Sequence, residues 1–360
     1  MSTVNHNDII SLIPDAASLL RDIVAISSFS GLEEQRCNFL SEWIESKGLF
    51  YKRLKNNLIA FERDEDSSKP VLLLNSHIDT VKPGGGYTFD PFNPPLHADK
   101  ILGLGSNDAG ASVVSMLYVY LYLSQNGNLP FNLKLLLSAQ EENSGPDGIS
   151  YAIKEAGRVD AAVIGEPTCM KAAVAERGLL VIDGFAYGES GHAARDEGVN
   201  SIYLAMEDID ALKRFKFSRI SPLMGEVKLS VTQIEAGTQH NVVPDICHYV
   251  VDIRPTDLYN NAEIVQMLSA CVKGRLKPRN LSNRSSATPN DHPLIKAAQE
   301  SGKELFISPT TSDWMRLNVP ALKMGPGDSS RSHRADEYVF ISEIEEGIKG
   351  YISFLEQLNL

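Results

Sequence analysis

Short, almost continuously apolar runs alternate with helical patterns through the first half of this chain. The run VLLLN at 71–75 has the composition of a strand that is buried on both faces. The same reasoning predicts strands at 57–61, 133–138 and 161–165, and helices at 109–124 and 147–156. Alternation of this kind predicts a layered α/β domain with a largely parallel sheet.

The order of the predicted elements changes after about residue 178. From there the sequence predicts strand 179–187, helix 198–214, strands 226–235 and 245–253, helix 261–273 and a final segment without a clear pattern. This is the β-α-β-β-α-β order of a ferredoxin-like unit. We therefore predict an inserted α+β domain.

The ends of the chain are assigned to the first domain. Residues 8–24 have a helical pattern, and Ser30 is a candidate N-cap for a second helix that ends at Gly48. The polar, turn-rich stretch 277–291 returns the chain to the first domain after the insertion. The predicted division is 1–177 and 284–360 for the first domain and 178–283 for the insertion.

Composition and charge restrict the classes of protein to consider. With 43% hydrophobic residues among 360, the chain can bury the cores of two domains, which argues against a disordered or fibrous protein. A formal net charge of -12 argues against a phosphate-binding surface, so we expect no nucleic-acid partner. No apolar run reaches the roughly 20 residues that span a bilayer, and the first residues lack the basic flank of a secretory signal. We expect a cytoplasmic protein without a membrane partner, whose four widely spaced cysteines are reduced.

Polar residues with metal-binding chemistry follow the predicted strands. His77 and Asp79 stand two apart just beyond the run at 71–75, and alternate residues of a strand point to the same face. Such a pair also occurs as ordinary polar residues at a strand end. Asp108 lies between a glycine-rich turn and a predicted helix, where its carboxylate is a candidate metal ligand or a helix cap.

Three more carboxylates and a second histidine occur in comparable places. Glu141 and Glu142 follow the strand LKLLLS and point in different directions, which suits one metal ligand and one general base, or else a solvated acidic turn. Glu166 follows the strand 161–165, and His333 lies in a polar loop before the last helix. Together, histidines and carboxylates at the strand ends of one domain favour zinc. A carboxylate that bridges two cations would let five ligands hold a metal pair.

Seven short motifs carry a resemblance to a known family: HIDT, GSND, EE, IGEPT, GHAA, DIRP and SHRADEYV. They occur in the family's order over essentially the whole chain, and on them the sequence resembles the M20 family of metallopeptidases and deacylases. The resemblance implies a zinc-peptidase-like catalytic domain with two Zn²⁺, for which Co²⁺ or Mn²⁺ are possible substitutes. It also implies an inserted lid or dimerisation domain, a homodimer formed through it, and hydrolysis of linear amides.

The resemblance implies a role for each candidate residue of the first domain. The implied metal ligands are His77, Asp108, Glu142, Glu166 and His333. Asp108 would bridge the metals, with one histidine and one glutamate completing each site, His77 with Glu166 and His333 with Glu142. Glu141 is left as the catalytic base, and Asp79 would orient His77 through its other ring nitrogen.

Four further residues match family positions near the substrate. His192 in GHAA would stabilise the oxyanion, often in the neighbouring subunit, unless it is an exposed turn histidine. Arg254 in DIRP would hold the substrate carboxylate with its planar fork of donors, although a surface arginine is the alternative. Asn241 and Gly325 would bind substrate, and each could equally serve turn geometry.

The chain departs from the family pattern directly after Asp108. Relatives usually continue with Met, Lys, Gly and Gly, whereas this chain has Ala109, Gly110, Ala111 and Ser112. The neighbouring lysine is lost, so we expect different packing or a different substrate mouth there. Gly103 and Gly105 resemble the start of a dinucleotide-binding fingerprint, but Asp108 stands in place of its third glycine, and we discard that hypothesis.

The resemblance implies that the substrate is a small N-acyl amino acid. The length and the motifs IGEPT and SHRADEYV favour an N-acetyl or N-succinyl derivative of ornithine or citrulline, as in the acetylornithine deacetylases of arginine biosynthesis. Desuccinylation of a diaminopimelate precursor and dipeptide cleavage remain alternatives, because the same zinc chemistry serves all three. A metal-binding scaffold without activity is a further alternative, and the retention of Glu141 with all five implied ligands argues against it.

Overall fold

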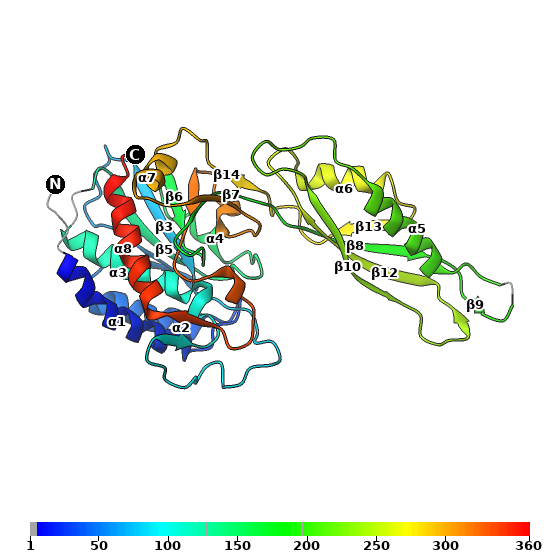
Figure 1. Ribbon diagram of the computed structural model, residues 1–360, viewed down its shortest axis with the longest axis horizontal. Helices are drawn as coiled ribbons and strands as arrows, with labels where there is room; N and C mark the ends of the chain where they lie inside the picture. Colours follow the sequence, from blue (N-terminus) through cyan, green and yellow to red (C-terminus); the bar gives the residue numbers. More distant parts are fainter. Residues whose placement is uncertain (1–5, 127–128, 196) are drawn as a thin grey trace. The chain divides into compact units, whose positions relative to one another are not determined.

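The computed structural model describes residues 6–126, 129–195 and 197–360 of the chain (Figure 1). These residues form two compact units. Unit 1 comprises Met1–Val174, Thr288–Phe306 and Ser312–Leu360, and unit 2 comprises Ala175–Ala287 and Ile307–Thr311. The insertion predicted at 178–283 lies inside the longer segment of unit 2. Its assignment as a lid or dimerisation domain stays a prediction.

The core of unit 1 is a mixed sheet whose central strands are parallel. Within the described residues the nine strands follow the order β1-β2-β5-β3-β6-β16-β7-β14, with β15 beside β7. Their bounds are β1 Tyr51–Leu54, β2 Asn57–Ala60, β3 Val71–His77, β5 Asn132–Ser138, β6 Ala161–Ile164, β7 Ala172–Glu176, β14 Ser286–Ala287, β15 Leu305–Ser308 and β16 Ala321–Lys323. Strands β5, β3, β6 and β16 run parallel to one another, whereas β2 and β7 join them antiparallel. The prediction of an α/β fold with a largely parallel central sheet is therefore confirmed.

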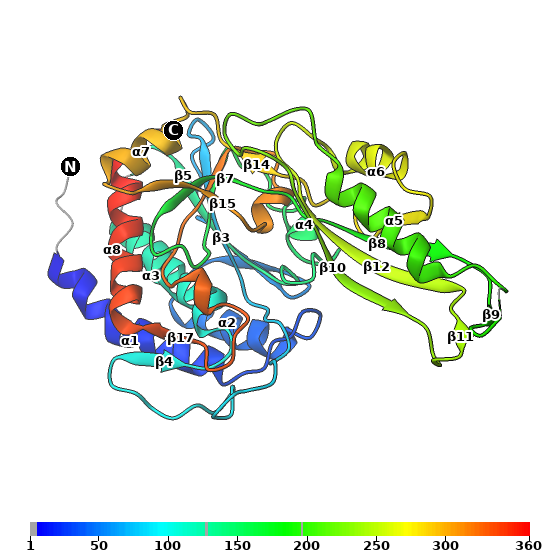
Figure 2. The same ribbon diagram turned by 45° about the vertical axis from the view of Figure 1, so that its right-hand side comes forward.

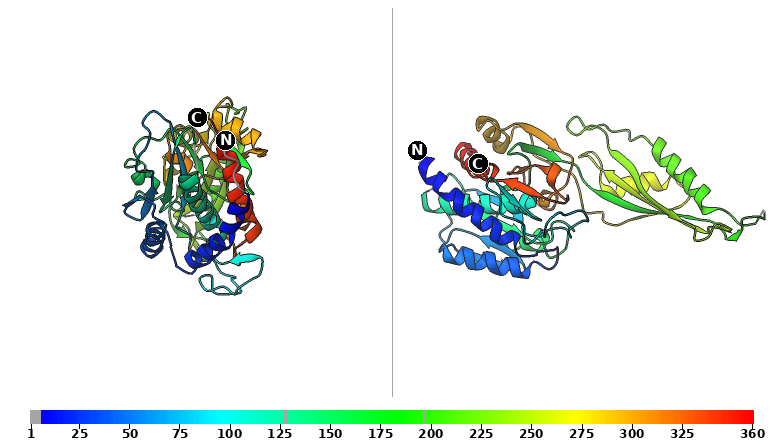
Figure 3. Two further views of the ribbon diagram at one scale, coloured as in Figure 1. Left: turned by 90° about the vertical axis from the view of Figure 1, so that its left-hand side faces the viewer. Right: turned by 60° about the horizontal axis from the view of Figure 1, so that its bottom comes forward.

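Helices cover both faces of this sheet because its apolar side chains alternate between them. Leu72 and Leu74 of β3 pack into the larger apolar cluster, and Leu73 packs into a smaller one on the opposite face. The helices of unit 1 are α1 His6–Val24, α2 Glu34–Ser46, α3 Ala111–Asn126, α4 Ile149–Ala152, α7 Pro293–Glu300 and α8 Ile341–Gln357. Helices α1, α3 and α8 pack against one another, and α1 (blue) runs beside α8 (red) in Figures 2 and 3. None of the helices in the described ranges has the length and apolar character needed to cross a membrane.

Short elements complete unit 1 near the carboxyl ends of its parallel strands. They are β4 Lys100–Leu102, β17 Tyr338–Phe340, the π-helical turn η1 Ser106–Gly110, and the 3₁₀ turns η2 Asp313–Arg316 and η3 Ser329–Arg331. Strands β4 and β17 pair antiparallel, so they bring the segment before η1 beside the segment after η3. Two regions that are far apart in sequence, around residues 105 and 335, thereby meet at one edge of the unit.

Unit 2 has the predicted β-α-β-β-α-β order. In the described part of the chain its main sheet has four antiparallel strands in the order β10-β12-β8-β13. The bounds are β8 Leu180–Tyr187, α5 Ser201–Arg214, β10 Lys228–Ala236, β12 Ile246–Arg254, α6 Asn261–Ser269 and β13 Arg275–Pro278, with β9 Gly191–His192 and β11 Val242–Val243 as a separate pair. Residues from α5 and α6 pack with one face of β8 and β12 in a single apolar cluster.

Two local predictions were wrong. Ser30 does not cap α2, because the helix begins four residues later, with Glu33 at the cap position. The helix predicted at 147–156 is reduced to Ile149–Ala152 and followed by a turn that ends at Gly157, which has a φ of 70°. The final segment of the insertion forms β13 against β8 and completes the predicted order. Its one aliphatic side chain, Leu276, stands between two charged residues, which explains why no strand pattern was visible.

Candidate metal centre

Three parallel strands deliver the candidate ligands to one edge of the unit 1 sheet. His77 is the last residue of β3, Glu141 and Glu142 follow β5, and Glu166 follows β6. The carboxyl ends of neighbouring parallel strands lie at the same edge, which is where open α/β sheets place their ligand sites. The fold therefore explains why residues from distant parts of the sequence meet here.

The carboxylate of Asp108 lies between two histidines. It comes from η1, and the peptide bond between Asp108 and Ala109 is cis. Asp108 Oδ1 is 3.2 Å from His77 Nε2, and its Oδ2 is 3.7 Å from Nε2 of His333, in the loop between η3 and β17. Because each oxygen faces a different imidazole, this carboxylate has the geometry of a bridge between two binding positions.

A glutamate lies beside each histidine. His333 Nε2 is 2.9 Å from Glu142 Oε2, and His77 Nε2 is 3.9 Å from Glu166 Oε1. The structure thus brings together all five residues that the sequence predicted as metal ligands, in two sets that share Asp108.

Donor atoms in two overlapping groups also lie within 4.8 Å of one another. One group is His77, Asp108 and Glu142, and the other is His77, Glu141 and Glu166. Both Asp108 and Glu141 therefore lie near His77. Asp108 is in direct contact with it, since its Oδ1 is 3.2 Å from His77 Nε2. Imidazole nitrogens and carboxylate oxygens are donors that zinc accepts.

Burial and mutual repulsion disfavour the ionised form of the glutamates in this cluster when no cation is bound. Burial, together with repulsion from Asp108, raises the pKa of Glu166 to about 8, and burial raises that of Glu141 well above its usual range. Although burial opposes it, the hydrogen bond to Asp108 helps to hold the pKa of His77 well above that of a free histidine. The hydrogen bond to Glu142 raises the pKa of His333 to about 9. An excess of buried acidic groups around two histidines fits a binding site for divalent cations.

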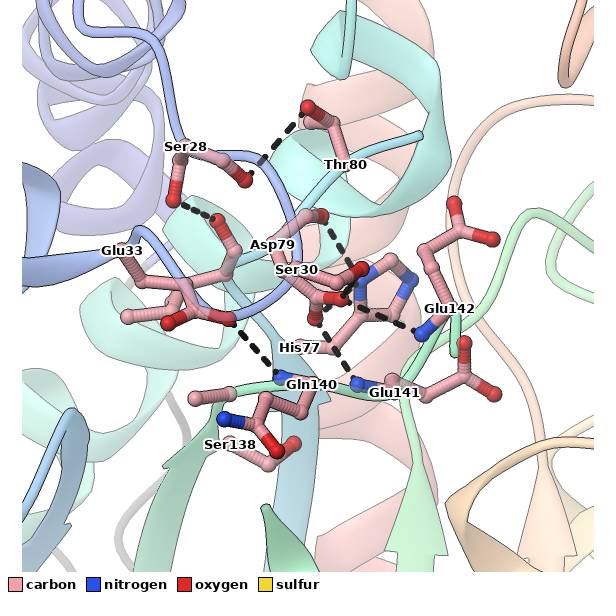
Figure 4. A network of polar contacts seen from close by, with 12 residues as sticks. Ser28, Ser30, Glu33, His77, Asp79, Thr80, Ser138, Gln140, Glu141 and Glu142 are labelled. Atoms are coloured by element: carbon pink, nitrogen blue, oxygen red, sulfur yellow. Dashed lines mark hydrogen bonds and ion pairs between the residues drawn. The ribbon is translucent and has the colours of Figure 1, made fainter. Parts of the chain in front are cut away.

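Asp79 contacts Nδ1 of His77, the ring nitrogen that does not face Asp108. Its carbonyl oxygen is 3.0 Å from His77 Nδ1, and its carboxylate Oδ1 is 3.5 Å from the same nitrogen. The carboxylate also accepts hydrogen bonds from the backbone N–H groups of Glu141 and Glu142 (Figure 4). Asp79 is thus in the position predicted for a residue that orients the first histidine.

Glu337 is part of the site and was missed by the sequence reasoning. It is buried, and its carboxylate accepts from the backbone N–H groups of Gly105, Asn107 and Asp108 at 3.1, 2.9 and 2.9 Å. Burial raises its pKa to about 7. It lies inside the motif SHRADEYV, but nothing local in the sequence shows that it reaches a loop more than two hundred residues away.

The loop of His333 is held by an ion pair between Arg331 and Glu343 that the sequence did not indicate. Arg331 donates to both carboxylate oxygens of Glu343, at 2.8 and 2.5 Å, and to the Tyr338 carbonyl at 3.2 Å. His333 itself has a φ of 58°, in the region that residues with a Cβ rarely adopt. The paired arginine fixes the start of a loop whose key residue is in an unusual conformation.

Gly325 and the altered segment after Asp108 meet beside Glu166. Gly325 is buried, and a Cβ there would lie 2.6 Å from the Glu166 carbonyl oxygen and would also strike the Ser112 hydroxyl. Only glycine fits this position without a shift, because backbone and side chain both approach it closely. The structure therefore gives Gly325 a packing role, and its contact with substrate stays a prediction.

The other three predicted residues belong to unit 2. His192 in β9 is opposite Val242 in β11, and the Ala193 N–H donates to the carbonyl of Asn241, so His192 and Asn241 are close neighbours on exposed backbone. Arg254 ends β12, and its Nε and Nη2 donate to the two carboxylate oxygens of Asp252 at 2.8 and 3.1 Å. Asp252 therefore engages one edge of the guanidinium, the edge formed by Nε and Nη2.

This fold, with its cluster of histidines and carboxylates, defines a metallohydrolase. The chain belongs to peptidase family M20/M25/M40, whose model matches residues 73–357. The resemblance drawn from the seven motifs is confirmed, and the chain is a hydrolase that acts on amide bonds.

Two curated relatives extend over nearly the whole chain. A peptidase M20 domain-containing protein of Schizosaccharomyces pombe is 27% identical over 362 residues, covering 97% of this chain and 86% of the relative. Acetylornithine deacetylase of Proteus mirabilis is 27% identical over 368 residues, covering 92% and 94%.

Solved structures have the same fold at lower identity. A tripeptidase from Staphylococcus aureus superposes with a TM-score of 0.78 at 20% identity, covering 96% of this chain and 98% of the other. A Bacillus subtilis protein, described as a dinuclear metal-binding peptidase of the M20 family, has a TM-score of 0.70 at 16% identity, covering 96% and 98%.

The raised pKa values predict a pH dependence for the metal-free protein. Glu166, Glu337 and His333 have folded-state pKa values of about 8, 7 and 9, all above their ordinary values of 4.5, 4.5 and 6.5. The folded state then binds more protons than the unfolded state, so its stability falls as the pH rises from about 5 to about 9. We expect the melting temperature of chelator-treated protein to fall over this range, and added zinc to raise it most at the alkaline end. A melting temperature that rises with pH in the chelated protein would contradict this account.

Proposed function

We propose that the chain is a two-zinc deacylase that hydrolyses the amide bond of a small N-acyl amino acid. The observation that carries the proposal is the position of Asp108 between two donor sets, His77 with Glu166 and His333 with Glu142. When bound there, two Zn²⁺ ions would lower the pKa of a water molecule and polarise the acyl carbonyl. Co²⁺ and Mn²⁺ accept the same donors and are possible substitutes.

Glu141 is the proposed general base. Its carboxylate lies in the cluster with His77 and Glu166, and burial raises its pKa well above the usual range, which suits a group that must take up a proton. In the proposed reaction Glu141 accepts a proton from the attacking water and later donates it to the departing amine. The products are a carboxylic acid and a free amino acid.

Residues of unit 2 would complete substrate binding. His192 is proposed to stabilise the oxyanion with its ring, which is exposed and accepts a local hydrogen bond from the Ala194 N–H. Arg254 is proposed to bind the substrate carboxylate and Asn241 to contact the substrate, as is Gly325 of unit 1. The predicted domains follow from this division: 1–177 with 284–360 as catalytic domain, and 178–283 as lid or dimerisation domain.

The preferred substrates are N-acetyl or N-succinyl derivatives of ornithine or citrulline, in arginine biosynthesis. Support comes from the acetylornithine deacetylase of P. mirabilis, which matches over 92% of this chain. Cleavage of short peptides is the second candidate, because the fold is also that of a tripeptidase. A cytoplasmic location belongs to the proposal, and the four cysteines, all free, agree with a reducing compartment.

The substrate is tested by measuring amine release from a panel. The panel contains N-acetylornithine, N-acetylcitrulline, their N-succinyl counterparts, succinyl-diaminopimelate and a dipeptide, each with zinc and with a chelator. We expect chelator-sensitive turnover of an ornithine or citrulline derivative. Turnover of succinyl-diaminopimelate or of the dipeptide instead would move the proposal to that class, and no turnover of any compound with zinc bound would favour the metal-binding scaffold.

The role of Glu141 is tested by Glu141→Gln. The substitution keeps the shape of the side chain but removes its ability to take up a proton, so we expect a fall in kcat of roughly 100- to 10,000-fold with both metals retained. The measurements are steady-state kinetics and zinc content by atomic absorption. Glu155→Gln, at a half-exposed residue that pairs with Lys52, is the matched control. Near-normal turnover of Glu141→Gln with zinc bound would contradict the assignment.

Homodimerisation through unit 2 is the last part of the proposal. Strand β10 is an exposed edge of its sheet, and the neighbouring helix α5 presents Tyr203 and Met206, which are 66% and 58% exposed. We expect a dimer in analytical ultracentrifugation that dissociates on combined Tyr203→Lys and Met206→Lys. Leu96→Lys, at an apolar residue of unit 1 that is 86% exposed, should leave the dimer intact. A wild-type monomer with full activity would exclude this arrangement.

A further inference from the structure

A segment near the N-terminus, in which Ser28, Glu33 and Arg36 are buried, contacts the loops that carry the candidate ligands and the candidate base. Residues 26–36 lead from the end of α1 into α2 and lie outside the range 73–357 that the family model matches. Within this segment, Glu33 has no exposed surface. We propose that Glu33 is a positioning residue that sets the direction of the Glu141 side chain, a role that rests on the proposed function, in which Glu141 is the base.

Three consecutive backbone N–H groups after β5 point at two carboxylates. The Gln140 N–H donates to Glu33 Oε1 at 3.2 Å, and those of Glu141 and Glu142 donate to Asp79 Oδ1 and Oδ2 at 3.0 and 3.1 Å (Figure 4). Hydrogen bonds to an ionised acceptor are roughly twice as strong as those between neutral groups. The two carboxylates therefore fix the path of the backbone on both sides of the candidate base.

Gln140 depends on such support because of its own conformation. Its φ is 56°, in the left-handed region that residues with a Cβ rarely adopt. A peptide in this conformation relaxes towards extended backbone unless its polar groups are held. Relaxation at Gln140 would rotate the following residue, Glu141, away from His77 and Glu166.

Donors from three sides hold the Glu33 carboxylate in place. Besides Gln140, the Gly31 N–H donates to Oε1 at 2.5 Å and Asn56 Nδ2 donates to Oε2 at 3.1 Å. Each of these partners is a donor, so the position fits an ionised carboxylate and not an amide, whose NH₂ group would face that of Asn56. Ser30 connects the segment that carries Glu33 to the second carboxylate, that of Asp79, because the Ser30 hydroxyl donates to Asp79 Oδ2 at 2.7 Å.

Separate bonds anchor the segment to the turn after β3. The Ser28 hydroxyl and Arg36 Nη1 both donate to the Ile78 carbonyl, at 2.8 and 2.9 Å, and the Thr80 N–H donates to the Ser28 carbonyl at 2.8 Å. Figure 4 shows Ser28 and Thr80 beside Asp79. Because these bonds do not involve Glu33, the segment stays in place when Glu33 is changed, and an effect on the loop of Glu141 can be separated from unfolding.

The kinetic test compares Glu33→Gln with Glu34→Gln, the same change at the neighbouring exposed residue. The zinc-loaded proteins are assayed on the amide that the wild type hydrolyses. For Glu33→Gln we expect kcat to fall about tenfold or more, because the carboxylate of Glu141 no longer points at its working position. KM and zinc content should stay within about twofold, because the groups that bind substrate and metal are unchanged. Glu34→Gln should match the wild type.

A second substitution provides a rescue. Adding Asn56→Asp to Glu33→Gln turns the facing amide into an acceptor, so the introduced NH₂ group has a partner and the oxygen can return to Gln140. We expect this double variant to recover most of the lost kcat. Asn56→Asp alone places two carboxylates face to face and should lower kcat, so recovery in the double variant cannot be a general effect of the aspartate.

Amide hydrogen exchange of the zinc-free proteins gives a readout that is independent of activity. We expect a peptide covering residues 139–145 to exchange about tenfold faster in Glu33→Gln, with β3 and β5 unchanged. Unchanged kcat and unchanged exchange at 139–145, or faster exchange spread over both strands, would overturn the positioning role. If the wild type hydrolyses no amide, the proposed function fails, and the exchange of 139–145 still decides whether Glu33 holds this loop.

Discussion

The concentration of negative charge at one edge of the unit 1 sheet is the constraint on which the rest of this site depends. Asp108, Glu142 and Glu166 converge there on two histidines, and Glu141 lies among them. Desolvated carboxylates so close together repel one another, which is seen in the raised pKa of the buried glutamates. Burial and repulsion favour the protonated forms of Glu141, Glu142 and Glu166, whereas bound cations would favour the ionised forms, so metal binding would stabilise this edge of the sheet.

A site of this kind must hold its ligands without using up their donor atoms. In this protein the loops are held through their backbone. Three further carboxylates, Glu33, Asp79 and Glu337, accept hydrogen bonds from backbone N–H groups of Gln140–Glu142 and Gly105–Asp108. Their hydrogen bonds fix the backbone at Asp108, Glu141 and Glu142 and leave the side chains of these three residues available. The cost is more buried negative charge close to the metals, which those cations would also offset.

Much of the first unit could be predicted from the sequence because its signals are local. The run at 71–75 is apolar throughout, as a strand covered on both faces must be, and metal-binding residue types follow directly after such strands. Glu33 and Glu337 could not be found in this way, since each acts on a backbone segment that is distant in sequence. Ser30 was misassigned for the same reason: its hydroxyl bonds to Asp79, 49 residues away, and not to the first turn of the next helix.

Chemistry and substrate choice place different demands on the two units. The hydrolytic groups of unit 1 are fixed by buried hydrogen bonds, whereas Arg254 of unit 2 spends its Nε and Nη2 on Asp252, a partner two residues away in the same strand. A substrate carboxylate that binds Arg254 would therefore use the second edge of the guanidinium, with donors on Nη1 and Nη2, because Asp252 takes only one N–H of Nε and one of Nη2. Asp252 aligns the arginine and would also repel an anionic ligand, so the affinity of Arg254 for a carboxylate would depend on the pair and not on the arginine alone. Family membership fixes the class of reaction, the hydrolysis of an amide bond, whereas the choice of substrate depends on the side chains that would contact it.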